Sequence, residues 1–275
     1  MITMPTTESD ESAPEPDVTP PRPSVLRAIL GPAVFLGFMA LKFAKVAFIA
    51  LKSIKYFGTA ASMVVSIAAY ALLFGWPFAV GFVLLIFVHE LGHAVQLRRE
   101  GVAAGAPVFI PFVGAVIAMR EMPRNAAMEA RVGIAGPILG SVGAGVVHAA
   151  ALATGSDMLL ALAFTGYFLN LFNLVPVSPL DGGRIAAALS PKLWAAGIAI
   201  MLLLFLARPN PVLLLIIIVG GMDSWRRWKE RSEPEAAAYY RDVPVMFRRV
   251  LGFTWIGLIV ALVFAMQVSH VPQSL

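Results

Sequence analysis

Two histidines and a glutamate stand close together in the apolar stretch Phe82 to Arg98, which reads FVLLIFVHELGHAVQLR. On a helix, His89 and His93 project from the same face, because residues four apart are one turn away from each other. Their ring nitrogens can then bind one zinc ion, as in the HExxH pattern. Glu90, beside the first histidine, can take the proton of a water molecule that zinc activates. These residue types at this spacing predict the chemistry of peptide hydrolysis.

The alternative is that these are ordinary hydrogen-bonded core residues, since a five-residue pattern also occurs by chance. That alternative requires two imidazoles and a carboxylate to be buried together in hydrocarbon. A charge at the centre of a membrane costs at least about 2.5 kcal/mol on insertion scales, and ionisable groups there are functional by default. The sequence therefore favours a metal site.

The composition places this motif in a membrane protein. Of the 275 residues, 59% are hydrophobic and 13% are charged, and the mean hydropathy of +0.81 is too high for a soluble domain. No cysteine is present, so a zinc site must be built from histidines and carboxylates. The net charge is +5, but the basic residues lie beside apolar runs, where they orient helices and meet anionic lipid. We therefore expect the lipid bilayer as a partner and no nucleic acid.

The chain begins with two segments that precede the apolar core. Residues 1–23 are acidic and proline-rich, which is typical of a disordered cytosolic tail rather than of a signal peptide. Residues 24–57 carry four lysines within one arc of about 140° on a helical wheel, which predicts an amphipathic helix in the cytoplasmic interface. These lysines are Lys42, Lys45, Lys52 and Lys55. The alternative is that Val25 to Leu41 crosses the membrane, although a proline and two glycines interrupt this short run.

Further apolar runs predict the helices that position the motif. The longest have about the 20 residues that a helix needs to cross a bilayer. They are Gly58 to Trp76, Ala79 to Leu97, Val132 to Thr154, Met158 to Val175 and Val250 to Val268, and two shorter runs are Ala195 to Leu206 and Val212 to Met222. We therefore predict an all-α polytopic membrane protein with about seven transmembrane helices, within a range of roughly six to eight.

The stretch Val102 to Met119 has the length of another span, but its glycines and prolines argue against a helix. We interpret it as an extended or hairpin loop that dips into the membrane. Irregular backbone is tolerated at that depth only where protein or a wet cavity satisfies it, so we expect the loop to border the active site. The alternative is an apolar surface loop without a role.

Charge distribution gives the orientation of this multi-pass arrangement in the cell membrane. It places all 21 lysines and arginines except Arg208 on the cytosolic side, as the positive-inside rule requires. The N-terminus is then expected in the cytosol and the C-terminus outside. The expected domain boundaries give an intramembrane metalloprotease core at residues 58–223 and a cytosolic segment at 224–249. A last transmembrane helix with a short outer tail follows at 250–275.

A catalytic zinc ion takes three protein ligands and a water molecule, so a third ligand must come from elsewhere in the chain. The candidates in or beside apolar segments are His148, Asp157, Asp181, Asp223 and His270. Asp181 follows a proline-broken segment that can fold back towards His93, and the two glycines after it permit a close approach. The other four are expected at a different depth or in solvent. As an alternative or additional role, Asp181 could cap the following helix.

The motifs together resemble the site-2 protease family of intramembrane zinc metalloproteases. The likeness rests on HELGH in one apolar helix, AGPILGS in the next, and NLFNLVPVSPLDGGR after the one that follows, and it covers Ala79 to Leu189. It implies that zinc is bound by three residues and that the catalytic residue stands beside one of them. The implied ligands are His89, His93 and Asp181, and the implied catalytic residue is Glu90.

The resemblance also implies that Val102 to Met119 is the membrane-inserted β-hairpin of the family. Asn173 matches the asparagine of the pattern N-x-x-P-x-x-P-x-D-G, which suggests a role near the substrate or the oxyanion. One departure is visible, because family members often carry an asparagine after the Gly-Pro pair where this chain has Gly140. Whatever that asparagine contributes is absent here or supplied by another residue.

We therefore expect a zinc-dependent endopeptidase that cuts a peptide bond in or near a transmembrane helix of a substrate protein, as in regulated intramembrane proteolysis. Glu90 would serve first as a base towards water and then as an acid towards the leaving amine. The alternative is a non-catalytic membrane protein that binds or transports metal and keeps a relic protease site. Glu90 argues against that alternative, because zinc transport needs ligands and no general base.

Overall fold

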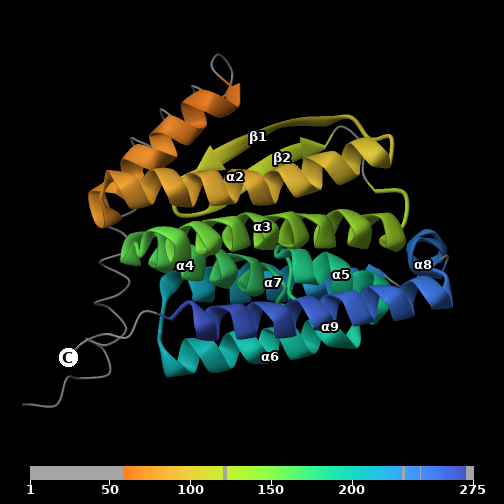
Figure 1. The fold of residues 1–275 in the computed structure, drawn as a ribbon. Helices are drawn as coiled ribbons and strands as arrows, with labels where there is room; N and C mark the ends of the chain where they lie inside the picture. The colour runs from red at the N-terminus through yellow and green to blue at the C-terminus, as the bar shows by residue number, and fades with distance from the viewer. Residues whose placement is uncertain (1–57, 120–122, 231–232, 242, 271–275) are drawn as a thin grey trace, which may run out of the picture.

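The computed structural model describes residues 58–119, 123–230, 233–241 and 243–270. The predicted tail 1–23 and the predicted amphipathic helix 24–57 lie outside these residues. The described part consists of helices and one β-hairpin (Figure 1). The helices are Gly58–Phe74, α2 Trp76–Arg99, α3 Ala126–Thr154, α4 Asp157–Asn173, α5 Asp181–Leu189, α6 Lys192–Ala207, α7 Pro211–Glu230, α8 Pro234–Arg241 and α9 Val245–Val268.

Helix α3 lies at the centre of the arrangement, with α2 on one side and α4 and α5 on the other (Figure 1). It begins at Ala126, upstream of the predicted span Val132 to Thr154, because the Asn125 side chain caps it by accepting a hydrogen bond of 2.9 Å from the Met128 N–H. The end of α2 is joined to the start of α3 by Glu100, which accepts two hydrogen bonds from the Arg131 guanidinium. This pair links the two helices at this end of the molecule.

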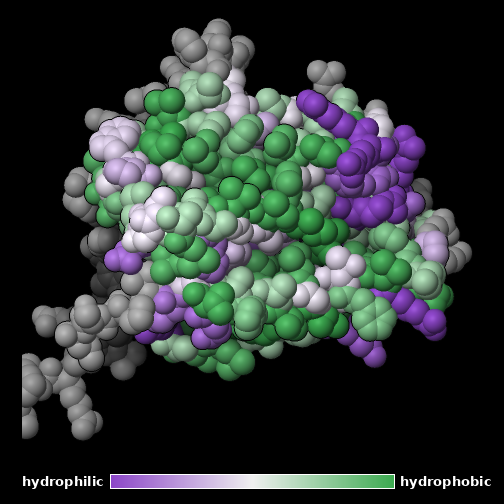
Figure 2. All heavy atoms as spheres, viewed as in Figure 1, coloured by the Kyte–Doolittle hydropathy of each residue, from purple (hydrophilic) through white to green (hydrophobic). Residues whose placement is uncertain are grey.

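Three of the described helices are long and apolar enough to cross a membrane: α2, α3 and α9. The helix Gly58–Phe74 and α6 are apolar but shorter, and α4 has 17 residues. The predicted count of about seven spans is therefore not confirmed, because several apolar runs form helices shorter than the roughly 20 residues of a full crossing. Figure 2 shows an apolar face with hydrophilic side chains gathered mainly at the end where α2 ends and α3 begins.

A turn separates α2 from the helix before it. The break lies at Gly75, and α2 starts at Trp76. Gly75 has a φ of 79°, which glycine adopts without steric cost. Pro77 then lies in the first turn of α2, where its missing N–H costs no intrahelical hydrogen bond.

The predicted hairpin is present between α2 and α3. Strands β1 (Ala104–Ile110) and β2 (Gly114–Met119) pair antiparallel, with Val108 opposite Val116. Phe109 is buried in an apolar cluster with residues of α2, and its N–H donates to the Ser62 hydroxyl. The hairpin is therefore anchored to the helical core, and its insertion into a membrane stays a prediction.

Candidate metal centre

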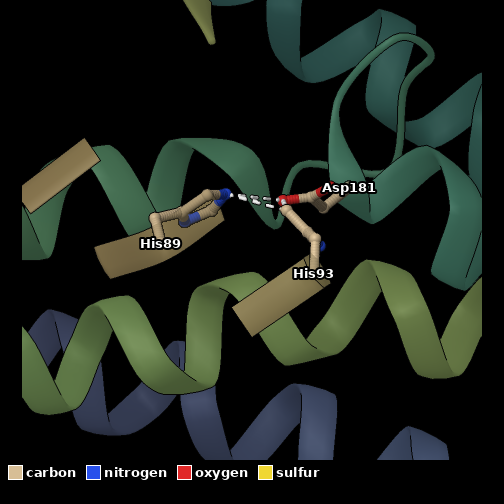
Figure 3. Close-up of side chains that lie close together, drawn as sticks. All are labelled: His89, His93 and Asp181. Atoms are coloured by element: carbon tan, nitrogen blue, oxygen red, sulfur yellow. Dashed lines mark hydrogen bonds and ion pairs between the residues drawn. The ribbon is translucent and has the colours of Figure 1, made fainter. Parts of the chain in front are cut away.

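The side chains of His89, His93 and Asp181 meet at one point in the interior (Figure 3). The two Nε2 atoms lie 3.1 Å apart, and the Asp181 Oδ2 atom lies 3.1 Å from His89 Nε2 and 3.2 Å from His93 Nε2. All three residues are at most 6% exposed. The structure thus brings together the three residues that the sequence predicts as ligands.

The outer nitrogens of both imidazoles face hydrogen-bond acceptors. His89 Nδ1 lies 2.8 Å from Asn170 Oδ1, and His93 Nδ1 lies 2.8 Å from the carbonyl oxygen of Val132. Because an oxygen acceptor requires a donor, each Nδ1 carries the proton of its neutral ring. Each Nε2 therefore directs an unprotonated lone pair towards Asp181.

This leaves three acceptors pointing at one another without a donor among them. The buried Asp181 Oδ2 has no hydrogen-bond donor in the described part of the chain, and its contacts with the imidazoles are ion pairs only if a ring takes up a second proton. A cation between the three atoms satisfies all of them together. Two ligands of a tetrahedral zinc ion lie roughly 3.3 to 3.5 Å apart, close to the distances found here. The group therefore fits a metal ion.

Glycines allow α3 to lie close enough to α2 for this geometry. A Cβ atom on Gly136 would lie 2.2 Å from His93 Nε2, and one on Gly92 would lie 2.3 Å from the carbonyl oxygen of Ala135. The small residues of α3 thus permit a close approach of the two helices. His93 lies directly against α3 because position 136 has no side chain.

Asp181 is held by the segment that connects α4 to α5. The indole of Trp255 donates to the Leu174 carbonyl at the start of this segment, and that of Trp194 donates to the Gly183 carbonyl after its end. A Cβ atom on Gly182 would lie 2.3 Å from the Leu174 carbonyl oxygen, so the turn closes only with glycine there. The cap of α5 is Leu180, without a side-chain hydrogen bond, so Asp181 is not acting as the helix cap.

Glu90 stands beside the metal-binding group on α2 and is 9% exposed. No hydrogen bond or ion pair joins its carboxylate to another residue in the described part of the chain. A buried carboxylate without a fixed partner next to a metal site is available to accept a proton. This is the arrangement that the sequence predicts for a general base.

The other candidates from the sequence lie apart from this group. His148 contacts the Tyr167 hydroxyl, Asp223 pairs with Arg226 and Arg227, and the His270 ring packs against Phe164. Asp157 is the first residue of α4, at the opposite end of that helix from the segment that carries Asp181. None of these four belongs to the metal-binding group of the described residues.

Two asparagines of α4 differ in what they contact. The Asn173 amide donates to the Leu169 carbonyl, and no described contact joins it to His89, His93 or Asp181, so its role stays a prediction. Asn170, which the sequence analysis does not single out, is the residue that contacts His89. Two features of the sequence could have pointed to Asn170, namely its position inside an apolar helix and the missing side chain at Gly140.

Comparison with known proteins adds a family match and several relatives. Residues 77–156 match the model of Peptidase family M50. The zinc metalloprotease MJ0392 of Methanocaldococcus jannaschii is 33% identical over an alignment of 160 residues that covers 50% of this chain and 46% of the relative. The putative zinc metalloprotease Rip3 of Mycobacterium tuberculosis is 32% identical over an alignment of 146 residues that covers 50% of this chain and 36% of the relative.

A plant relative is more distant. The probable zinc metalloprotease EGY2, chloroplastic, of Arabidopsis thaliana is 28% identical over an alignment of 176 residues that covers 46% of this chain and 32% of the relative. The matched region spans less than half the length of each of these three relatives. The residues that the family model matches carry the HExxH helix and the helix α3 that follows it.

Proposed function

We propose that the chain is a zinc-dependent intramembrane endopeptidase of the site-2 protease family, because the region that carries HELGH matches the model of Peptidase family M50. Its substrate would be a transmembrane protein that is cut in or near a membrane helix, as in regulated intramembrane proteolysis. The observation that carries the proposal is the convergence of the lone pairs of His89, His93 and Asp181, with Glu90 unpaired beside them.

The residues of the site have two roles, metal binding and proton transfer. His89, His93 and Asp181 supply three ligands, which is the number that leaves a fourth position open in a catalytic zinc site. When bound there, zinc supplies a Lewis acid that polarises the scissile carbonyl and acidifies water. Glu90 accepts the proton of the attacking water and delivers it to the leaving amine. A non-catalytic metal carrier would not need that carboxylate.

The membrane arrangement is part of the same proposal. Helices α2, α3 and α9 would cross the bilayer with the N-terminus in the cytosol and the C-terminus outside. A substrate helix must unwind before its peptide bonds become accessible, and an extended segment can then pair with the edge of a sheet. The two-stranded hairpin lies against α2 and exposes apolar side chains at Val113 and Val116. We propose that it receives the unwound substrate segment.

The direct test is the substitution Glu90→Gln in the purified full-length chain. We expect cleavage of single-span test substrates to fall by roughly 100-fold or more, because general acid–base catalysis contributes about 10²–10⁴. Zinc content, measured by mass spectrometry, should stay near that of the wild type because Glu90 is not a ligand. The control is Glu100→Gln, the same change at the end of α2, which should cleave normally. Wild-type cleavage by Glu90→Gln would show that the general base is misassigned.

A further inference from the structure

Asn170 is held rigidly in the interior between α3 and α4. It is 1% exposed, and its Nδ2 donates a hydrogen bond of 2.7 Å to the Gly166 carbonyl one turn earlier in α4. Because the amide nitrogen is engaged in this way, the oxygen Oδ1 must face the other direction. It lies 2.8 Å from His89 Nδ1.

The space for this amide comes from a glycine on the neighbouring helix. A Cβ atom on Gly140 would lie 2.2 Å from Asn170 Oδ1 and 2.9 Å from both Cγ and Nδ2. Any side chain at position 140 would therefore displace the amide. The Asn170 side chain of α4 therefore fills the space that Gly140 of α3 leaves open.

The two histidines differ in how their outer nitrogens are held. His93 Nδ1 donates to the main-chain carbonyl of Val132, which no substitution at that position removes. His89 Nδ1 donates to a side chain, so its proton and ring orientation depend on one residue. The partner of a ligating histidine fixes the tautomer and the direction of the coordinating nitrogen.

We propose that Asn170 is a positioning residue that holds the proton of His89 on Nδ1 and directs its Nε2 lone pair to the metal. The proposal rests on the proposed zinc site. Asn170 does not touch the metal or the substrate and acts only through His89. Loss of such a partner typically weakens metal affinity by 10 to 100-fold.

A purely structural role for Asn170 makes a different prediction. The Asn173 amide also donates to the carbonyl four residues earlier, at 3.0 Å, but its oxygen reaches no ligand. If the helix contact alone mattered, leucine at either position would lower stability and leave zinc affinity unchanged. If the acceptor for His89 matters, only the change at position 170 should weaken zinc binding.

The experiment measures zinc affinity by competition with a chelator on the full chain in detergent, together with the thermal midpoint of the metal-free protein. We expect Asn170→Leu to weaken zinc binding by about 10 to 100-fold. Asn170→Asp keeps an oxygen acceptor on a side chain of the same length. The zinc affinity of this variant should therefore be no more than about threefold weaker than that of the wild type. Asn173→Leu, the matched control, should retain wild-type zinc affinity.

Two outcomes would overturn the inference. One is wild-type zinc affinity in Asn170→Leu, which would mean that His89 needs no such partner. The other is an equal loss in Asn170→Asp and Asn170→Leu, which would mean that the acceptor oxygen is not what matters. Both presuppose a wild-type chain that binds zinc. A wild-type chain that binds no zinc would instead refute the proposed function itself.

Discussion

In the described part of the chain, two groups of polar side chains are built around buried acids, and they differ in how those acids are neutralised. In the metal centre, His89, His93 and Asp181 present three acceptors to one another. In the second group, which we call the Glu129 cluster, Glu129 is 6% exposed and faces donors only. The cluster consists of Glu129 on α3, Asp223 and Arg227 on α7, and Tyr239 on α8.

The Glu129 cluster is complete without any ligand. The guanidinium of Arg227 lies 3.3 Å from both carboxylate oxygens of Glu129 and also donates to Asp223. The Tyr239 hydroxyl donates a hydrogen bond of 2.6 Å to Glu129 Oε2. Every acceptor in the cluster that faces inward thus meets a donor, so the group holds α3, α7 and α8 together.

The comparison teaches that burial of ionisable groups does not by itself indicate a metal site. The metal centre differs because the atoms that face one another inside it are all acceptors. Both imidazoles donate their N–H proton to groups outside the centre. A buried acceptor without a partner costs about 1–3 kcal/mol, and more when it is charged. A bound cation removes that cost in the metal centre, whereas the Glu129 cluster has no such need.

The largest expected effect follows from replacing the carboxylate of the metal centre, Asp181. Asp181→Asn should lower zinc affinity by more than the roughly 100-fold seen when an outer partner is lost, and should abolish cleavage. The neutral amide is a poorer ligand than a carboxylate. Its NH₂ group can instead donate to an imidazole lone pair, so the metal-free variant should be at least as stable as the metal-free wild type.

Zinc competition and thermal unfolding of the metal-free proteins check this prediction. The control is His148→Ala, since His148 contacts Tyr167 and not the metal-binding group. It should keep wild-type zinc affinity and cleavage. Normal zinc in Asp181→Asn together with metal loss in His148→Ala would contradict the ligand assignment.

The second prediction removes the negative charge at the centre of the Glu129 cluster. Glu129→Gln should destabilise the protein by roughly 3 kcal/mol, the low end for breaking a buried ion pair, because Arg227 keeps Asp223. Zinc affinity should stay unchanged, the reverse of the result for Asp181→Asn. Glu100→Gln is the matched control, because its partner Arg131 is 40% exposed and such pairs contribute about 0–1 kcal/mol. Equal destabilisation by both changes would contradict the distinction.

The sequence predicted the parts of the site that depend on local geometry. The spacing of His89 and His93 determines that they share a helix face, and the glycines and prolines of residues 102–119 exclude a helix there. Asp181 was selected by depth and by the broken segment before it, and the structure brings it to the histidines. Whether these residues bind zinc is a proposal that the metal assays above test.

The rest depends on packing between distant segments. Asn170 and His89 are 81 residues apart in the sequence, and Glu129 and Tyr239 are 110 residues apart. The spacing of residues within one helix therefore cannot predict either contact. The number of spans was predicted from apolar content, whereas helix length depends on where each chain segment turns. Helix α6, for example, ends after 16 residues.

The smallest expected effect concerns the remaining donor of the Glu129 cluster. Tyr239→Phe should lower stability by about 1.5 kcal/mol, the low end for a hydrogen bond to a charged group, because Arg227 still neutralises Glu129. Burial, and then the negative charge of Glu129, raise the pKa of the Tyr239 hydroxyl above its ordinary value. The folded protein therefore keeps this proton at a pH where the unfolded chain, with a tyrosine pKa of about 10, loses it.

This difference between the folded and unfolded pKa of Tyr239 predicts how the effect of Tyr239→Phe on stability changes with pH. The contribution of Tyr239 is fully present below about pH 10 and is lost as the pH rises above the unfolded pKa towards the folded one. The gap in thermal midpoint between wild type and Tyr239→Phe should therefore be constant from pH 7 to about pH 9 and should close at higher pH. A gap for Tyr239→Phe that widens above about pH 10 would contradict the hydrogen bond to Glu129.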